Sequence, residues 1–217
     1  MPLVVIQARM GSVRLPGKVL LPFRGKTILQ YLIDNISMYS VDKSKIVLAT
    51  SDQRQDDVLE VHASDLDVLC VRGSERNVFE RFQKAALLSD EEDIVRLTGD
   101  NPLLSMEVLN YSIKKHLKNN VTLTSTRYVS QDGTVERCLP KGNGVDVFKA
   151  EILRNTDCSM LTDIEKEHVV PFFYKFDYQL VTLGDMVEEG VDEAFLRSRS
   201  ITVDTEQDYQ CLIAMEY

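Results

Sequence analysis

The sequence predicts an α/β protein in which helices cover both faces of a mostly parallel sheet. Short apolar, β-branched runs alternate along the chain with segments whose apolar residues recur at helical spacing. Strands joined by helix-length connections pair in parallel, so this alternation favours a parallel sheet. The length of 217 residues and the hydrophobic content of 44% suffice for one core. We therefore expect residues 1–217 to form a single domain.

Strands and helices alternate through the first half of the chain. The expected strands span 3–6, 45–50, 67–71 and 93–97, and the expected helices span 27–37, 56–63, 77–88 and 105–117. Thr27 is a candidate cap of the first helix. Near the end of the chain, a short strand at 200–203 is expected to precede a helix that Asp204 or Thr205 caps.

The stretch at about 127–144 breaks the alternation with glycines, a proline and charges of both signs. It is expected to form an excursion or hairpin outside the main sheet. Asp146 follows where the chain returns. It is either a residue of the site or an exposed strand residue.

Composition excludes several classes of protein. The formal net charge of −9 argues against nucleic acid as a partner, because a phosphate backbone calls for a basic face. No apolar run approaches the ~20 residues that span a bilayer, and the first residues do not resemble a signal peptide. The four cysteines are scattered without zinc-like spacing. We therefore expect a cytoplasmic protein without a membrane segment.

Positive charge is gathered in one loop against this acidic average. The string ARMGSVRLPGK follows the first strand and carries Arg9, Arg14 and Lys18, whereas no Asp or Glu occurs before Asp34. Glycines let backbone N–H groups approach a ligand, and such a loop suits a polyphosphate, with a triphosphate as the leading interpretation. The alternative is a basic surface loop. The spacing matches neither the P-loop nor the dinucleotide fingerprint.

Polar residues also follow the other expected strands, and Asp100 is the strongest candidate among them for a ligand contact. It stands after Gly99 and before Pro102, which holds its carboxylate on a turn. A triphosphate requires Mg²⁺, which takes one or two protein carboxylates and keeps phosphate and water in its shell. A turn or cap aspartate is the alternative. If the strands are neighbours, these polar residues form one rim at the carboxyl ends of the sheet.

At these residues the chain resembles the sugar cytidylyltransferases, which include enzymes that activate 3-deoxy-octulosonate and acylneuraminate. The phrase IQARMGSVRLPGKVL is most similar to the spore-coat polysaccharide branch, and further matching strings follow in order: ATSD at 49–52, RGS at 72–74, TGD at 98–100, EHVVP at 167–171 and VDT at 203–205. The resemblance implies a Rossmann-like, three-layer αβα nucleotidyltransferase fold, that of nucleotide-diphospho-sugar transferases. It also implies a homodimer, with the excursion at 127–144 near the sugar site and the dimer interface.

The resemblance assigns roles to individual residues. It implies phosphate contacts from the basic loop, base contacts from the RGS string, a metal pair, and two sugar contacts: Ala8, Arg9, Gly11, Ser12, Arg14 and Lys18 for CTP; Arg72 and Ser74 for the base; Asp100 and Asp204 for Mg²⁺; Asp146 and His168 for the sugar. Arg14, Lys18, Asp100 and Asp204 are the expected catalytic residues. For His168 the alternatives are proton transfer and a histidine whose hydrogen bonds orient a lid. Arg81 is expected to be a surface ion-pair partner.

These roles describe transfer of CMP from CTP to a sugar, with pyrophosphate as the leaving group. The acceptor is expected to be an acidic or modified sugar of surface polysaccharide biosynthesis, and Mg²⁺ is the expected cofactor. Two alternatives stay open: another nucleotidyltransferase or glycosyltransferase of the same fold, and a non-catalytic module that binds nucleotide sugars.

Overall fold

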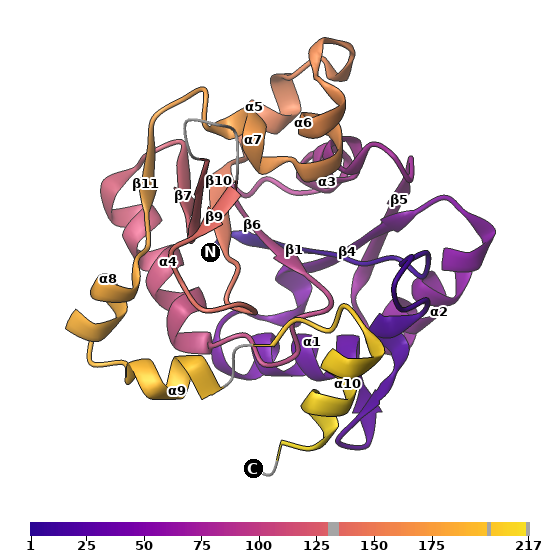
Figure 1. Ribbon diagram of the computed structural model, residues 1–217. Coiled ribbons are helices and arrows are strands. Elements are labelled where there is room, and N and C mark those ends of the chain that lie inside the picture. The colour runs from indigo at the N-terminus through magenta and orange to yellow at the C-terminus, as the bar shows by residue number, and fades with distance from the viewer. Residues whose placement is uncertain (130–134, 199–200, 216–217) are drawn as a thin grey trace.

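The main sheet is mostly parallel and runs through the middle of the molecule (Figure 1). The computed structural model describes residues 1–129, 135–198 and 201–215. Within these residues the sheet has seven strands in the order β11-β7-β10-β6-β1-β4-β5. Their bounds are β1 (Leu3–Gln7), β4 (Ile46–Ser51), β5 (Leu69–Gly73), β6 (Asp93–Thr98), β7 (Leu123–Ser125), β10 (Asp146–Lys149) and β11 (Tyr178–Leu180). Only β10 among them is antiparallel to its neighbours.

Helices cover both faces of the sheet. Their bounds are α1 (Ile28–Tyr39), α2 (Asp57–Asp65), α3 (Val78–Leu87), α4 (Met106–Asn119), α5 (Ala150–Asn155), α6 (Asp163–His168), α7 (Val170–Phe173), α8 (Leu183–Glu188), α9 (Glu193–Ser198) and α10 (Glu206–Ile213). Thr27 caps α1 by accepting a hydrogen bond from the Gln30 amide at 3.0 Å, as expected. None of the helices described here has the length and apolar character needed to cross a bilayer.

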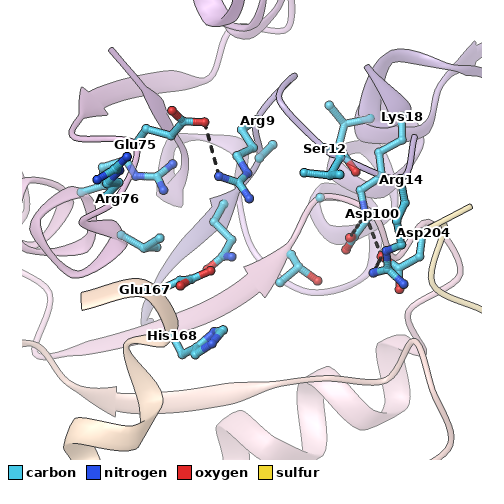
Figure 2. Close-up of a pocket in the computed structure, with 18 of the residues that line it drawn as sticks. Arg9, Ser12, Arg14, Lys18, Glu75, Arg76, Asp100, Glu167, His168 and Asp204 are labelled. Atoms are coloured by element: carbon cyan, nitrogen blue, oxygen red, sulfur yellow. Dashed lines mark hydrogen bonds and ion pairs between the residues drawn. The ribbon is translucent and has the colours of Figure 1, made fainter. Parts of the chain in front are cut away.

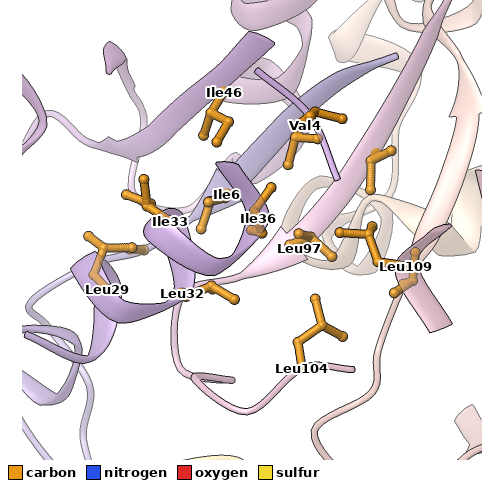
Figure 3. Packing of buried hydrophobic residues seen from close by; sticks show 14 of the residues in the cluster. Val4, Ile6, Leu29, Leu32, Ile33, Ile36, Ile46, Leu97, Leu104 and Leu109 are labelled. Atoms are coloured by element: carbon orange, nitrogen blue, oxygen red, sulfur yellow. The ribbon is translucent and has the colours of Figure 1, made fainter. Parts of the chain in front are cut away.

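The core lies on both sides of the sheet because successive side chains of a strand point to opposite faces. Val4 and Ile6 of β1 pack with α1, α2, α4, α8 and α9, whereas Leu3 and Val5 pack with α3, α5 and α7. Figure 3 shows the first of these clusters, in which α1 lies against the strands. The result is the three-layer αβα arrangement that the alternation and the resemblance predicted.

The four strands predicted in the first half of the chain are neighbours, in the order β6-β1-β4-β5. Their carboxyl ends therefore meet in one rim, as expected for a parallel sheet. Two corrections concern the later chain. β7, β10 and β11 were not predicted, and the described residues 201–203 are not in a strand. They form an extended connection that donates a hydrogen bond from the Val203 amide to the Asp100 carbonyl at 2.9 Å.

Two small antiparallel sheets lie outside the main one. β2 (Pro22–Phe23) pairs with β3 (Lys26–Thr27) after the basic loop, and β8 (Arg127–Val129) pairs with β9 (Val135–Arg137). The second pair lies in the stretch where an excursion or hairpin was predicted; residues 130–134 of that stretch lie outside the described residues. Its role at a sugar site or dimer interface stays a prediction.

Candidate active site

A cleft of about 790 Å³ opens at the carboxyl-end rim of the sheet. Its walls come from the basic loop, the turn after β6, the start of α3, the end of α6 and the connection before α10. Figure 2 shows Arg9 and Glu75 at one end, a group of ion pairs around Asp100 at the other, and His168 facing them from α6. Segments far apart in the sequence thus share one polar space.

The basic loop is held to the sheet by a buried carboxylate. Asp56 accepts hydrogen bonds from the Met10 amide at 2.7 Å and from the Ser51 amide and hydroxyl. The loop then closes on itself, because Gly17 donates from its amide to the Met10 carbonyl at 2.9 Å. Gly17 has a φ of 72°, a conformation that favours glycine. This turn directs Lys18 back toward the sheet.

Lys18 lies between two aspartates at one end of the cleft. Its Nζ is 2.5 Å from Asp100 Oδ2 and 3.0 Å from Asp204 Oδ1, and Arg14 Nη2 also lies 3.0 Å from Asp204 Oδ1. The Lys18 side chain is only 11% exposed, whereas that of Arg14 is 64% exposed. The cluster of Arg14, Lys18, Asp100 and Asp204, called the ion centre below, thus has a buried cation at its base and an exposed one at its mouth.

The connection before α10 brings Asp204 to Asp100. Its backbone is bound to the Asp100 turn through Val203, and Thr205, rather than Asp204, caps α10 with Asp208 in a reciprocal capping box. The cap interpretation of Asp204 is therefore wrong. Because the cap is supplied by its neighbour, the Asp204 carboxylate is free to face Lys18.

The charges around Asp204 keep its carboxylate suited to bind a cation, and Asp100 has an oxygen available for one. Burial alone would raise the pKa of Asp204, but the hydrogen bond and charge of Lys18, with Arg14 and Lys141, outweigh it and hold the pKa below its ordinary value. Asp100 Oδ1 is buried and has no hydrogen-bond partner among the described residues. Two carboxylates around one cation, with an oxygen to spare, fit a Mg²⁺ ion that shares its shell with phosphates. No cluster of three or more acidic, histidine or cysteine ligands occurs in the described part of the chain.

The opposite end of the cleft is rich in arginine. Arg9 Nη1 lies 3.4 Å from Glu75 Oε1, and Arg76 and Arg81 line the same wall. Arg81 is buried at 2% exposure, so the expectation of a surface ion-pair partner is wrong. Its spacing from Val78 and Ala85 places it on the buried stripe of α3, and this signal was present in the sequence.

The end of α6 forms a third wall. His168 lines the cleft together with Asp163 and Glu167 of the same helix. Directly after it, Val169 has a φ of 63°, a rare conformation for a β-branched residue, and is fully buried. The sharp change of direction between α6 and α7 therefore leaves His168 at the cleft.

A second cavity of about 190 Å³ adjoins the ion centre. Thr98 and Asp100 line both spaces, and Asn101, Arg127 and Arg137 complete the polar wall of the second one. Two of its polar atoms, Asn101 Oδ1 and Arg127 Nε, are buried without a hydrogen-bond partner in the described residues. Such atoms favour a polar ligand in this cavity.

Asp146 lies behind this second cavity. It is fully buried and binds Arg96 Nη1 at 2.9 Å, Ser125 Oγ at 2.7 Å and the Arg127 guanidinium. The alternative of an exposed strand residue is therefore wrong. A direct contact with a sugar stays a prediction, whereas the observed contacts make Asp146 the residue that orients Arg127.

Most of the residues predicted for the site line the cleft: Ala8, Arg9, Ser12, Arg14, Lys18, Asp100, His168 and Asp204. Gly11, within the basic loop, does not line the cleft, and a Cβ there would stand 2.7 Å from Gln55 Nε2. Arg72 and Ser74 do not line it. Arg72 instead donates to the Ser51 and Gln53 carbonyls, so the base contacts predicted for the RGS string gain no support from this arrangement.

Comparisons with known proteins agree on one family. A family model described as cytidylyltransferase matches residues 3–216. The spore coat polysaccharide biosynthesis protein SpsF of Bacillus subtilis is 32% identical over 223 residues, which cover 98% of this chain and 85% of that protein. The 3-deoxy-manno-octulosonate cytidylyltransferase of Haemophilus influenzae is 28% identical over 89% of this chain and 71% of its own length. Among solved structures, a cytidylyltransferase from Leptospira borgpetersenii superposes with a TM-score of 0.79 at 29% identity, covering 97% of this chain and 84% of that one.

Proposed function

The chain belongs to the cytidylyltransferase family, and we propose that it transfers CMP from CTP to a sugar with release of pyrophosphate. One observation carries the proposal: Lys18 and Arg14 converge on Asp100 and Asp204 at the end of the cleft. Cations for a polyphosphate and carboxylates for its metal ion are the two requirements of phosphoryl transfer chemistry.

The basic loop holds the triphosphate. Arg14 grips phosphate oxygens with its planar fork, and Lys18 supplies a point charge at the base of the cleft. The backbone of the loop approaches the same phosphates, with Ala8 and Ser12 on the cleft wall. These contacts place positive charge against the β- and γ-phosphates, where negative charge grows as pyrophosphate leaves.

Asp100 and Asp204 are the residues that would hold Mg²⁺. When bound, the ion would neutralise phosphate charge and lower the pKa of an attacking hydroxyl. The contribution of the chain is to hold both carboxylates on a turn and a capped connection, so that their geometry is fixed before the substrate arrives.

The acceptor sugar occupies the second cavity beside Asp100. A sugar hydroxyl there lies next to the ion centre. It gives up its proton to solvent as its oxygen attacks the α-phosphorus in line, and the new O–P bond forms as the bond to the β-phosphate oxygen breaks. Arg127 and Arg137, which line this cavity, suit an acidic sugar. His168 lines the main cleft instead, so its proposed contact is with the part of the substrate that lies in the cleft. SpsF, the relative from Bacillus subtilis, is named for spore coat polysaccharide biosynthesis, which supports a surface polysaccharide sugar.

The proposed reaction uses no protein nucleophile, so positioning and charge neutralisation account for the catalysis. Use of a nucleoside triphosphate agrees with the cytoplasmic location expected from the sequence. A homodimer rests on the resemblance alone, and sedimentation analysis of the purified protein tests it.

The test is a screen for pyrophosphate release. The protein is incubated with Mg²⁺, each of the four ribonucleoside triphosphates, and a panel of 2-keto-3-deoxy acids and amino sugars. Release that requires CTP and one class of sugar, and that falls by several hundredfold or more in Asp100→Asn and in Asp204→Asn, is expected. Pyrophosphate release unchanged in both variants would refute the role of the ion centre. CTP binding without release across the panel would favour the non-catalytic module.

A further inference from the structure

One buried charged side chain of the cleft has no hydrogen-bond or ion-pair partner among the residues that the structure describes. Arg81 projects from the buried face of α3, is 2% exposed and lines the cleft wall. It passes close to the end of β5, where a Cβ on Gly73 would stand 3.0 Å from Arg81 Cγ. Gly73, the centre of the RGS string, therefore makes room for this arginine.

The guanidinium of Arg81 is not satisfied by the residues around it. Across residues 1–129, 135–198 and 201–215, it makes no hydrogen bond or ion pair, and its buried Nε has no partner. Burial lowers the pKa of Arg81, and the charge of Arg9 lowers it further, against the opposing effect of Asp56 and Glu75. Buried charges are costly unless they are paired and hydrogen-bonded, so this geometry calls for an acceptor from a ligand.

The place of Arg81 indicates which part of the ligand it meets. The ion centre holds the opposite end of the cleft, and Figure 2 shows that end separated from Arg9, Glu75 and Arg76 by the width of the pocket. If the triphosphate lies on the ion centre, the nucleoside extends toward the arginine-rich end. Arg81 then faces the base.

We propose that Arg81 is the residue that selects the nucleobase, by donating two parallel hydrogen bonds to adjacent acceptors on the edge of cytosine. The inference rests on the proposed function, since it takes CTP as the nucleotide. The guanidinium is a planar fork of N–H donors, and it pairs best with two acceptors side by side. Cytosine presents N3 and O2 in that arrangement.

Uracil does not present two adjacent acceptors to this guanidinium. Its N3 carries a hydrogen, so the fork would meet a donor where cytosine offers an acceptor, and a buried donor would stay unpaired. Glu75, on the same wall, can accept from the exocyclic amino group of cytosine, the contact that acidic side chains make with this base. Uracil has a carbonyl oxygen at that position.

The other two arginines of this wall are less suited to the task. Arg9 is paired with Glu75, and Arg76 is exposed, so both supply general positive charge rather than a fixed fork. Arg76 therefore provides a matched control: an arginine of the same cleft whose removal is expected to weaken all nucleotides alike.

The test measures equilibrium binding of CTP and UTP by calorimetry in Mg²⁺, without turnover. The wild-type protein is expected to bind CTP more tightly. In Arg81→Met the ratio of the two dissociation constants is expected to fall roughly tenfold or more, the discrimination typical of a bidentate contact to a base. Arg81→Lys keeps the charge but not the fork, and its ratio is expected to fall as well. In Arg76→Met both affinities are expected to weaken with an unchanged ratio.

An unchanged CTP to UTP ratio in folded Arg81→Met and Arg81→Lys would overturn the inference, and so would a wild-type protein without preference between the two. Circular dichroism and the melting temperature check that the variants are folded, and Arg81→Lys serves where Arg81→Met does not fold. If Arg81 does not select the base, the wild-type protein still releases pyrophosphate. If the proposed function is wrong, the wild-type protein releases no pyrophosphate, but the ratio of its dissociation constants for CTP and UTP can still be measured.

Discussion

Replacing Asp146 by Asn tests how strongly one buried charge supports this architecture. Asp146 is the shared partner of Arg96 and Arg127, and the Arg96 side chain is 5% exposed. Burial alone would raise the pKa of Asp146, but the charges of Arg127 and Arg96 outweigh it and lower the pKa. The variant keeps the shape of the side chain and removes the one negative charge between two arginines.

The expected cost is large because both arginines lose their counter-ion inside the protein. Removing one partner of a buried ion pair typically costs about 3–5 kcal/mol. For a chain of this length, that corresponds to a fall of roughly 6–20 °C in melting temperature. The matched control is Asp34→Asn, because Asp34 pairs with Lys26 at a half-exposed site and an exposed pair contributes only ~0–1 kcal/mol.

Urea denaturation at pH 7 gives the free energy of unfolding of both variants and the wild type. Because the pKa of Asp146 is depressed in the folded state, its stabilisation is present above pH ~4 and disappears as the pH falls below that value. The gap between wild type and Asp146→Asn should therefore narrow in acid. A loss below about 1 kcal/mol at pH 7, no greater than that of Asp34→Asn, would refute the buried-charge account.

Two further predictions concern the connection before α10 and the acid stability of the fold. Gly142 has a φ of 92°, and a Cβ there would stand 2.4 Å from the Ile201 carbonyl oxygen, so Gly142→Ala should lower both melting temperature and pyrophosphate release. Gly25→Ala, at φ 75° with open space around it, should lower only the melting temperature. An equal loss of pyrophosphate release in the two glycine variants would contradict the reasoning.

The second prediction concerns Asp185. Burial would raise the pKa of Asp185, but the hydrogen bonds from Lys115 and Thr182, with the charge of Lys115, together outweigh it and the pKa falls to about 2. Its stabilisation is present above pH ~4 and lost on titration toward pH 2, so unfolding measured across that range should show wild type and Asp185→Asn converging; a constant gap would refute this.

The first half of the fold could be predicted from the sequence because its signals are long and periodic. The strands that became β1, β4, β5 and β6 and the helices between them each carry a clear apolar pattern, and Thr27 marks the first cap. The later strands β7, β10 and β11 have only three or four residues, and β10 enters antiparallel. Such short pairings depend on tertiary contacts rather than on local pattern.

The candidate site was predictable where one loop carries it and not where distant segments meet. The basic loop could be recognised in the sequence from its concentration of arginine and lysine and from its glycines. The approach of Asp204 to Asp100 depends on a backbone hydrogen bond from Val203, which no local pattern encodes, and only the resemblance anticipated it. The prediction that Arg81 lies at the surface was wrong because arginine is rarely buried. Its position among the apolar residues of α3 was nevertheless visible in the sequence.

Arg72 shows the opposite error. Its position at the end of β5 suited a ligand contact, but its guanidinium donates to the carbonyl of Ser51 at the end of β4 and to that of Gln53 just after it. It also pairs with Asp57 and Glu60 of α2. Local sequence placed it correctly at the rim. Only the tertiary structure shows that its donors are already used within the chain.

Phosphorus NMR of the complete reaction tests the central claim most directly, because it identifies which phosphorus is attacked. With CTP, Mg²⁺ and the active sugar, the account predicts a new phosphodiester signal and an equal amount of pyrophosphate, both absent in Asp100→Asn. CDP with a sugar phosphate monoester would show transfer of the γ-phosphoryl group instead. That result would contradict nucleotidyl transfer at this ion centre.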